Sequence, residues 1–157
     1  MLLIPNSDDR LENLAGRLRL AENPTADLVG MVVSEACPRT RMLDRTSSTA
    51  RRIEALTKSS AWADLALDLI ARELPFWSVR RLVLEDGVWC CSLSSRPGMP
   101  IELDDTADAN HESMPLAMLA ALVEARRKAG TACRTQAQSV PQVEPHRGHV
   151  LCCDNFA

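Results

Sequence analysis

The sequence predicts an α+β fold made of a small αββα module, a helical N-terminal extension and a disordered C-terminal tail. Residues 77–85 and 88–94 are runs rich in Val, Leu and Trp, and Asp86-Gly87 joins them. This dipeptide favours the type I′ turn of a two-residue β-hairpin. Residues 61–73 and 115–128 flank the hairpin and repeat apolar residues at helical spacing. The module is therefore predicted to consist of a helix, a β-hairpin and a second helix.

The N-terminal extension, residues 1–58, is predicted to be helical. Apolar residues recur at helical spacing over residues 8–22. Asn23-Pro24 is typical of an N-cap followed by proline in the first turn of a second helix. We expect that helix to end near Cys37, because Pro38 cannot continue it.

A basic segment, residues 39–58, follows these helices. It carries six basic and two acidic residues, with a Thr-Ser-Ser-Thr run in its middle. We expect a poorly packed linker that contains a helix from about Thr49 to Leu56. Together with the two helices before it, this segment completes the predicted extension.

The module, residues 59–130, begins with a helix that Ser59 or Ser60 is expected to cap and that Pro75 ends. Its apolar face is formed by Trp62, Leu65, Ala66, Leu69 and Ile70. Residues 96–113 are predicted to be a loop. The closing helix starts at Pro115 and runs to Lys128, with Gly130 as the residue that ends it. Residues 131–157 are polar and without period, so we expect them to be disordered.

The turn determines the register of the hairpin, because side chains alternate between the two faces of a strand. The predicted pairs are Glu85 with Val88, Leu84 with Trp89, Leu82 with Cys91, and Arg80 with Leu93. The predicted buried face consists of Leu82, Leu84, Trp89, Cys91 and Leu93. The predicted outer face, which is only half apolar, consists of Val79, Arg81, Val83, Cys90 and Ser92.

Composition excludes some classes of function. The chain has 157 residues and a formal net charge of −3, and only 3% of its residues are aromatic, which disfavours single-strand nucleic-acid binders that stack bases. No apolar run approaches the roughly 20 residues of a membrane span. The first residues do not resemble a signal peptide, so we expect a cytoplasmic protein with six reduced cysteines.

The segment from about residue 59 to residue 126 resembles the phage ABA sandwich domain, a small domain of phage and prophage proteins. The matching features are the helix Ala61–Ala71, the turn and strand Asp86-Gly87-Val88-Trp89-Cys90-Cys91-Ser92-Leu93, and the helix start Met114-Pro115-Leu116-Ala117-Met118-Leu119-Ala120-Ala121-Leu122. The resemblance implies a bacterial protein from a prophage or other mobile element. It implies no catalytic residue.

The strongest functional hypothesis is an interaction or assembly role. The half-apolar outer face and the two open edges of a lone hairpin favour contact with a protein partner or a second copy. The candidate surface consists of Trp77, Val79, Arg81 and Val83, and Trp77 is expected to be its exposed anchor.

The alternative hypothesis is nucleic-acid binding by the basic segment. The candidate phosphate contacts are Arg39, Arg41, Arg45, Arg51 and Arg52. Such contacts would make binding strongly dependent on salt. The acidic net charge and the absence of a known nucleic-acid-binding motif favour a solvated face instead.

Two groups of residues suggest metal sites. The alternating run Asp104, Thr106, Asp108, Asn110 and Glu112 has the oxygen ligands of a calcium loop, but it lacks the mid-loop glycine and closes too early. The tail holds His146, His149, Cys152 and Cys153, which are zinc-type ligands crowded on one short segment. We interpret the first as an acidic loop and the second as an adventitious binder at most, and we expect no cofactor.

Catalysis has little support in the sequence. A cysteine nucleophile, Cys90 or Cys91, would need a base, and the nearest histidine is His111. We interpret Cys91 as a small core residue. The protein is therefore not expected to be an enzyme.

Overall fold

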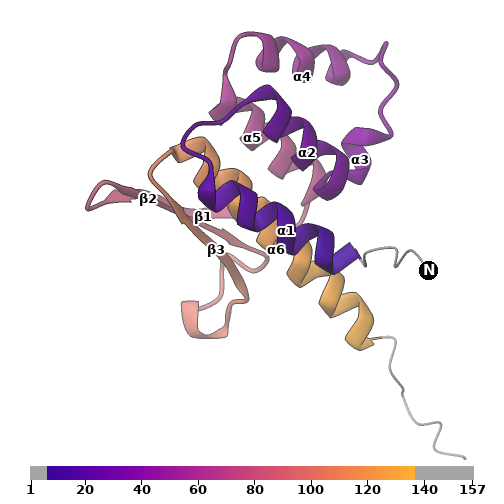
Figure 1. Ribbon diagram of the computed structural model, residues 1–157. Helices are drawn as coiled ribbons and strands as arrows, with labels where there is room; N and C mark the ends of the chain where they lie inside the picture. The colour runs from indigo at the N-terminus through magenta and orange to yellow at the C-terminus, as the bar shows by residue number, and fades with distance from the viewer. Residues whose placement is uncertain (1–6, 137–157) are drawn as a thin grey trace, which may run out of the picture.

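The computed structural model describes residues 7–136 and shows an α+β fold (Figure 1). The helices are α1 (Ser7–Leu20), α2 (Ala26–Ala36), α3 (Pro38–Arg41), α4 (Ser48–Lys58), α5 (Trp62–Glu73) and α6 (Met114–Gln136). The strands are β1 (Ser78–Glu85), β2 (Val88–Ser94) and β3 (Thr106–His111), with a short 3-10 helix, η1 (Ile101–Leu103), before β3. The strands form one antiparallel sheet in the order β1-β2-β3.

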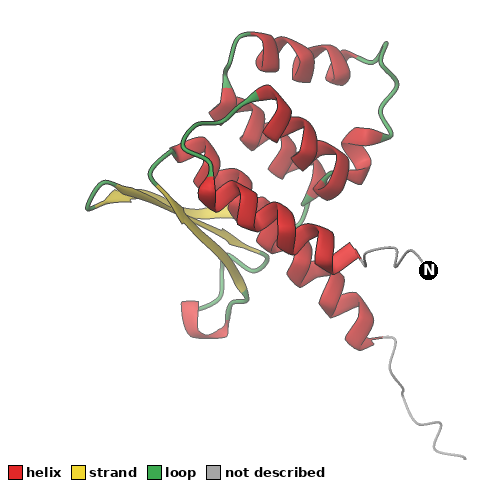
Figure 2. Cartoon of the chain, viewed as in Figure 1, coloured by secondary structure: helices red, strands yellow, loops and turns green. Residues whose placement is uncertain are grey.

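Helix α6 lies at the centre of the fold. It packs against β2 and β3 on one side and against α1, α2 and α5 on the others. The helices therefore cover one side of the sheet, as Figure 2 shows. Helix α4 lies farthest from the sheet and packs on α5. None of the helices within residues 7–136 combines the length and apolar character that crossing a bilayer requires.

One hydrophobic cluster joins the predicted extension to the predicted module. Leu14 and Leu18 of α1 and Val32 of α2 are buried in the same cluster as Leu69 of α5 and Leu93 of β2. Helix α6 contributes Leu116, Ala117, Met118, Leu119, Ala121, Leu122, Val123 and Ala125. Burial of each leucine stabilises the fold by about 1.5–3 kcal/mol. Helices α1 and α2 are therefore part of the core.

A buried carboxylate also ties the basic segment to the core. Glu73, at the end of α5, is 2% exposed. It accepts hydrogen bonds from the Thr40 backbone N–H and hydroxyl, both at 2.7 Å, and from the Arg39 N–H at 3.2 Å. These N–H groups belong to the first turn of α3, where backbone donors lack helical partners. Glu73 thus caps α3 from a distant helix.

The hairpin turn is confirmed. Asp86 and Gly87 both have positive φ, 51° and 83°, as a type I′ turn requires. The pairs nearest the turn are the predicted ones, but a bulge between Val79 and Arg81 shifts the rest. The predicted pairing of Arg80 with Leu93 is wrong, because the bulge inserts one residue and places Val79 opposite Leu93.

The prediction of a continuous loop over residues 96–113 is wrong, since β3 lies within it. Ala107 pairs with Leu93 and Ala109 with Cys91, so these small residues share the face that α6 covers. Asp108 and other polar residues of β3 alternate onto the opposite face. Small side chains allow α6 to approach the strand closely, and the third strand satisfies one edge of the hairpin.

Several helix ends also differ from the prediction. Thr25 is the N-cap of α2, accepting a hydrogen bond from the Leu28 N–H at 3.3 Å, so Pro24 precedes the cap. Helix α2 ends at Ala36 with Cys37 as its C-cap, as predicted. Pro38 then opens the additional short helix α3, where its missing N–H costs nothing. The N-cap of α5 is Ala61, and no side chain caps it. The expected capping role of Ser59 or Ser60 is therefore wrong.

The two remaining helices extend beyond their predicted bounds. Helix α4 includes the predicted 49–56 helix, and it has no fully buried residue. Helix α6 continues through Gly130 to Gln136, so the predicted disorder is wrong for residues 131–136. One exposed glycine costs a helix only about 1 kcal/mol, which the buried stretch of α6 offsets. Residues 137–157 lie outside the described part.

Candidate interaction surface

Strand β1 forms an open edge of the sheet. It pairs with β2 on one side, and no strand among residues 7–136 lies on its other side. The opposite edge, β3, faces α1 across a hollow of about 270 Å³ that Ala15 and Arg19 help to line. An uncovered edge strand exposes backbone N–H and C=O groups that another strand can bind. The open edge of β1 and its flanking residues are therefore the candidate interaction surface.

The four residues predicted for this surface do not lie together. Trp77 is half-buried and packs against the hydrophobic core, so it is not the exposed anchor. The bulge places Val79 on the helix-facing side, opposite Leu93, although it remains 36% exposed. Arg81 and Val83 share the outer face, as their register with β2 requires.

Two exposed apolar residues on or beside β1 were not predicted from the sequence. Phe76, next to Trp77, is 84% exposed, and Leu84, which was predicted to be buried, is 55% exposed. Leu84 has the predicted register but lies beside the turn, which projects beyond the helices in Figure 1. Periodicity identified its face correctly but could not show where the helical cover ends. Phe76 follows Pro75 outside any periodic segment, and its exposure had no sequence pattern to indicate it.

The outer face of the sheet is mixed in character. Arg81 and Glu85 form an ion pair along β1 and flank Val83. Cys90 lies opposite Val83, with its Sγ 3.8 Å from a carboxylate oxygen of Glu85. Two β1 charges of opposite sign on either side of one valine are therefore the main chemical feature of this strand.

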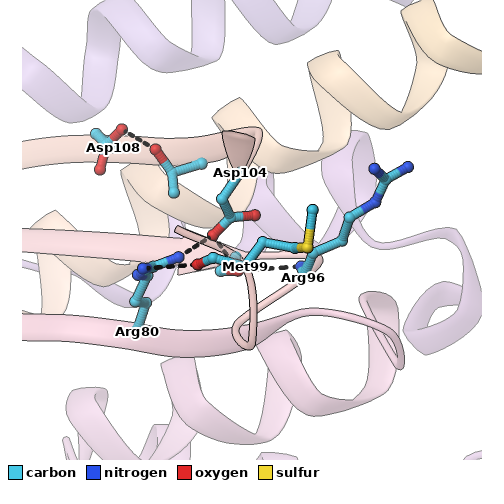
Figure 3. Close-up of polar contacts among 7 residues, drawn as sticks. Arg80, Arg96, Met99, Asp104 and Asp108 are labelled. Carbon is cyan, nitrogen blue, oxygen red and sulfur yellow. Dashed lines mark hydrogen bonds and ion pairs between the residues drawn. The ribbon is translucent and has the colours of Figure 1, made fainter. Parts of the chain in front are cut away.

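A buried polar cluster fixes the beginning of β1 (Figure 3). The Asp104 carboxylate accepts hydrogen bonds from the Arg80 guanidinium and, at 2.5 Å, from the Ser94 hydroxyl. Arg80 also donates to the Met99 carbonyl at 3.1 Å. The hydrogen bond from Ser94 and the charge of Arg80 lower the pKa of Asp104 despite its burial. The cluster holds the loop after β2 against the bulge.

The five predicted phosphate-contact residues divide into two groups. Arg39 donates to the Arg72 carbonyl at 3.2 Å, Arg41 donates to the Ser34 carbonyl at 3.1 Å, and Arg52 forms an ion pair with Asp68 at 2.5 Å. Arg45 and Arg51 are exposed, and within the described residues neither guanidinium group forms a hydrogen bond or an ion pair.

A groove of about 660 Å³ lies beside these arginines, between α3, α4 and α5. Its lining residues are Arg39, Leu43, Thr49, Arg52, Asp68, Ala71 and Arg72. Arg45 and Arg51 are not among them. The free guanidinium groups and the groove therefore do not form one site.

The buried thiols of Cys37 and Cys91 are poor nucleophiles. Burial raises the pKa of the Cys37 thiol to about 12 and that of Cys91 to about 11. Since the thiolate is the reactive form, both are inert near neutral pH. His111 lies opposite Trp89 on β3, and its Nδ1 accepts a hydrogen bond from the Ser113 N–H at 2.9 Å.

The predicted calcium-type run is divided between two structures. Asp104 belongs to the Arg80 cluster, whereas Thr106, Asp108 and Asn110 alternate along β3. Within residues 7–136 no group of three or more His, Cys, Asp or Glu residues is arranged to hold a metal ion. The cluster of His146, His149, Cys152 and Cys153 lies outside the described residues.

No protein-family model, curated protein or solved structure matches this chain.

Proposed function

We propose that the protein is a non-catalytic interaction module that binds a protein partner along the open edge of β1. The observation that carries the proposal is the exposure of apolar side chains on and beside an unpaired edge strand, with Leu84 as the central example. Strand addition would supply backbone hydrogen bonds for affinity, and alternate side chains would supply specificity.

The unpaired edge, rather than apolar exposure alone, supports this surface over the others. Phe76, Val79 and Leu84 lie on β1 or just before it, whereas the other exposed large apolar side chains of the described residues are on helices and loops that have no open strand edge: Leu20, Met42, Leu67, Met99 and Leu103. Proteins usually protect edge strands with charges, bulges or covering elements. Here the bulge and the Arg80 cluster protect only the beginning of β1, which leaves residues 82–85 open.

The proposal includes the context that the resemblance to phage ABA sandwich domains implies. The module would act in the bacterial cytoplasm as a product of a prophage or another mobile element. The order of a helix, a hairpin and a closing helix supports that resemblance. The additional strand β3 lies between the hairpin and the closing helix in the sequence.

Site-specific photo-crosslinking in the native host cell tests the surface. A photoreactive residue replaces Leu84 in one variant and Leu20 in a matched control. Leu20 is 87% exposed and lies at the end of α1, which faces the opposite edge strand, β3. We expect covalent protein adducts from position 84 and none from position 20. No adduct from position 84, or equal adducts from both positions, would refute an interaction site at β1.

Nucleic-acid binding by the basic segment is a second candidate, and the freedom of Arg45 and Arg51 supports it. It has less support because the other three arginines are held by internal hydrogen bonds or ion pairs. A gel-shift titration with duplex DNA over a salt series tests it, with Arg45→Ala/Arg51→Ala as the variant and Arg10→Ala on α1 as the control. Binding that the double variant leaves unchanged, or no binding at low salt, would exclude this candidate.

A further inference from the structure

We propose that the partner of the β1 edge is a second copy of this chain, and that two copies pair β1 with β1 in antiparallel orientation. This inference rests on the proposed function and specifies which protein binds the β1 edge. The two sheets would then form one continuous sheet around a twofold axis, an arrangement in which the same patch serves both copies.

The turn geometry determines which backbone groups of β1 are available. In a two-residue type I′ hairpin the residues that flank the turn, Glu85 and Val88, exchange hydrogen bonds. Hydrogen-bonded and non-hydrogen-bonded pairs alternate from there, so Val83 and Arg81 also bond to β2. The N–H and C=O groups of Leu82 and Leu84 consequently point to the open edge, and an added strand must bond to them.

This alternation permits only a few registers for a second β1. Leu82 or Leu84 must face Leu82 or Leu84 of the second copy, because the residues between them have no free backbone groups on that side. If Leu82 faces itself, Arg81 lies opposite Val83; if Leu84 faces itself, Glu85 lies opposite Val83. Both arrangements place a charge against an apolar side chain.

The remaining register is complementary in charge. When Leu82 faces Leu84 of the second copy, Arg81 lies opposite Glu85 of the second copy, and the twofold axis repeats that pair. Val83 then faces itself between the two ion pairs. Opposite charges placed directly across a sheet attract, whereas like charges repel. Only the register that joins Leu82 with Leu84 therefore places Arg81 of each copy opposite Glu85 of the other.

The same register covers exposed apolar surface. Leu82 and Leu84 project to the helix-facing side, so the leucines of both copies would meet there and shield the Leu84 side chain, which is 55% exposed in the single chain. The ladder would end at Arg81, because the bulge and the bonds from Arg80 to Asp104 and Met99 disturb the edge beyond it.

Sedimentation analysis of the purified full chain over a wide concentration range tests the inference. We expect a concentration-dependent dimer. Arg81→Glu and Glu85→Arg would each place like charges across the axis and weaken dimerisation by about tenfold or more, whereas the double variant Arg81→Glu/Glu85→Arg would restore it. Leu84→Lys would also weaken the dimer, and Leu20→Lys is the matched control. Arg81, Leu84 and Glu85 are exposed, so the variants should melt near the wild-type temperature.

Three results would overturn the inference. The first is a protein that stays monomeric at the highest soluble concentration, and the second is a dimer that is insensitive to all three single changes. The third is a double charge variant that fails to recover. Crosslinks from position 84 to a different protein, together with a monomeric purified chain, would reject the second copy as partner and leave the interaction function standing.

Discussion

Glu73 provides a sharp test of how the basic segment is attached to the fold. Glu73→Ala removes the acceptor of three hydrogen bonds, from the Arg39 N–H and from the N–H and hydroxyl of Thr40. Hydrogen bonds to a charged group contribute about 1.5–3 kcal/mol each, and they are not additive. Because the contact with Thr40 is buried, the N–H and hydroxyl of Thr40 cannot both form hydrogen bonds with water in its place. We expect the free energy of unfolding to fall by about 3–4 kcal/mol.

Glu73→Gln should have a smaller effect. Its amide oxygen can still accept both bonds from Thr40, but its NH₂ group would face the Arg39 N–H and the negative charge at the start of α3 would be lost. We expect a loss of about 1–2 kcal/mol. Glu54→Ala on α4 is the control, since Glu54 forms an exposed ion pair with Lys58, and exposed ion pairs contribute little to stability.

Urea denaturation measures all three variants. A domain of this size has a total stability of about 5–15 kcal/mol, so the variants should remain folded in water and show lower urea midpoints with an unchanged slope. The expected order of destabilisation is Glu73→Ala, then Glu73→Gln, then Glu54→Ala. If Glu73→Ala costs no more than the surface control, Glu73 does not cap α3, and the account of how this segment is held is wrong.

Three further predictions concern the sheet and the core. Burial raises the pKa of Cys37 to about 12 and that of Cys91 to about 11, from an ordinary 9.0. The contribution of these neutral thiols to stability is therefore complete below pH 9.0 and is lost as pH rises toward the folded-state values. Cys91→Ala should flatten this alkaline decline in melting temperature. Asp104, with its lowered pKa, contributes stability above the ordinary value of 3.8 that is lost as pH falls through the lower folded value; acid titration of Asp104→Asn should lack this component. A Cβ at Gly87 or Gly30 would meet no neighbour, so only backbone conformation matters at these positions. Gly87→Ala should destabilise the protein by about 1 kcal/mol because φ is 83° there, whereas Gly30→Ala inside α2 should stabilise it by about 0.5–1 kcal/mol. Melting temperatures that shift in the same direction for both variants would contradict this.

The parts of the fold with a strong local pattern could be predicted from sequence. The helix at α5, the start of α6 and the Asp86-Gly87 turn each combine apolar periodicity with a matching breaker or turn dipeptide. Strand β3 could not be found in this way, because Thr, Ala, Asp and Asn have modest or low strand propensity. Its signal was the alternation of small and polar residues, which was interpreted as an acidic loop.

The errors in the candidate site arise from tertiary structure. At the bulge that moves Val79, Arg80 lies outside the ladder and donates a hydrogen bond to Asp104, more than twenty residues later in the chain. Leu84 is exposed because the turn projects past α6, and the hydropathy of β1 contains no information about the position of that helix. Trp77 was interpreted as an anchor from its place at the strand start, but the core is close enough to cover it.

These long-range contacts also explain why only part of β1 is available for binding. The Arg80–Asp104 cluster distorts and covers the beginning of the strand, which protects that part from edge pairing. The regular remainder, between the bulge and the turn, is the stretch in which Arg81 and Glu85 flank Val83. A longer regular edge would admit additional registers and association with unrelated strands. By limiting the open edge to a few residues with opposite charges at its ends, the cluster would favour one pairing over aggregation, so Asp104→Asn should reduce the specificity of β1 as well as the stability of the loop.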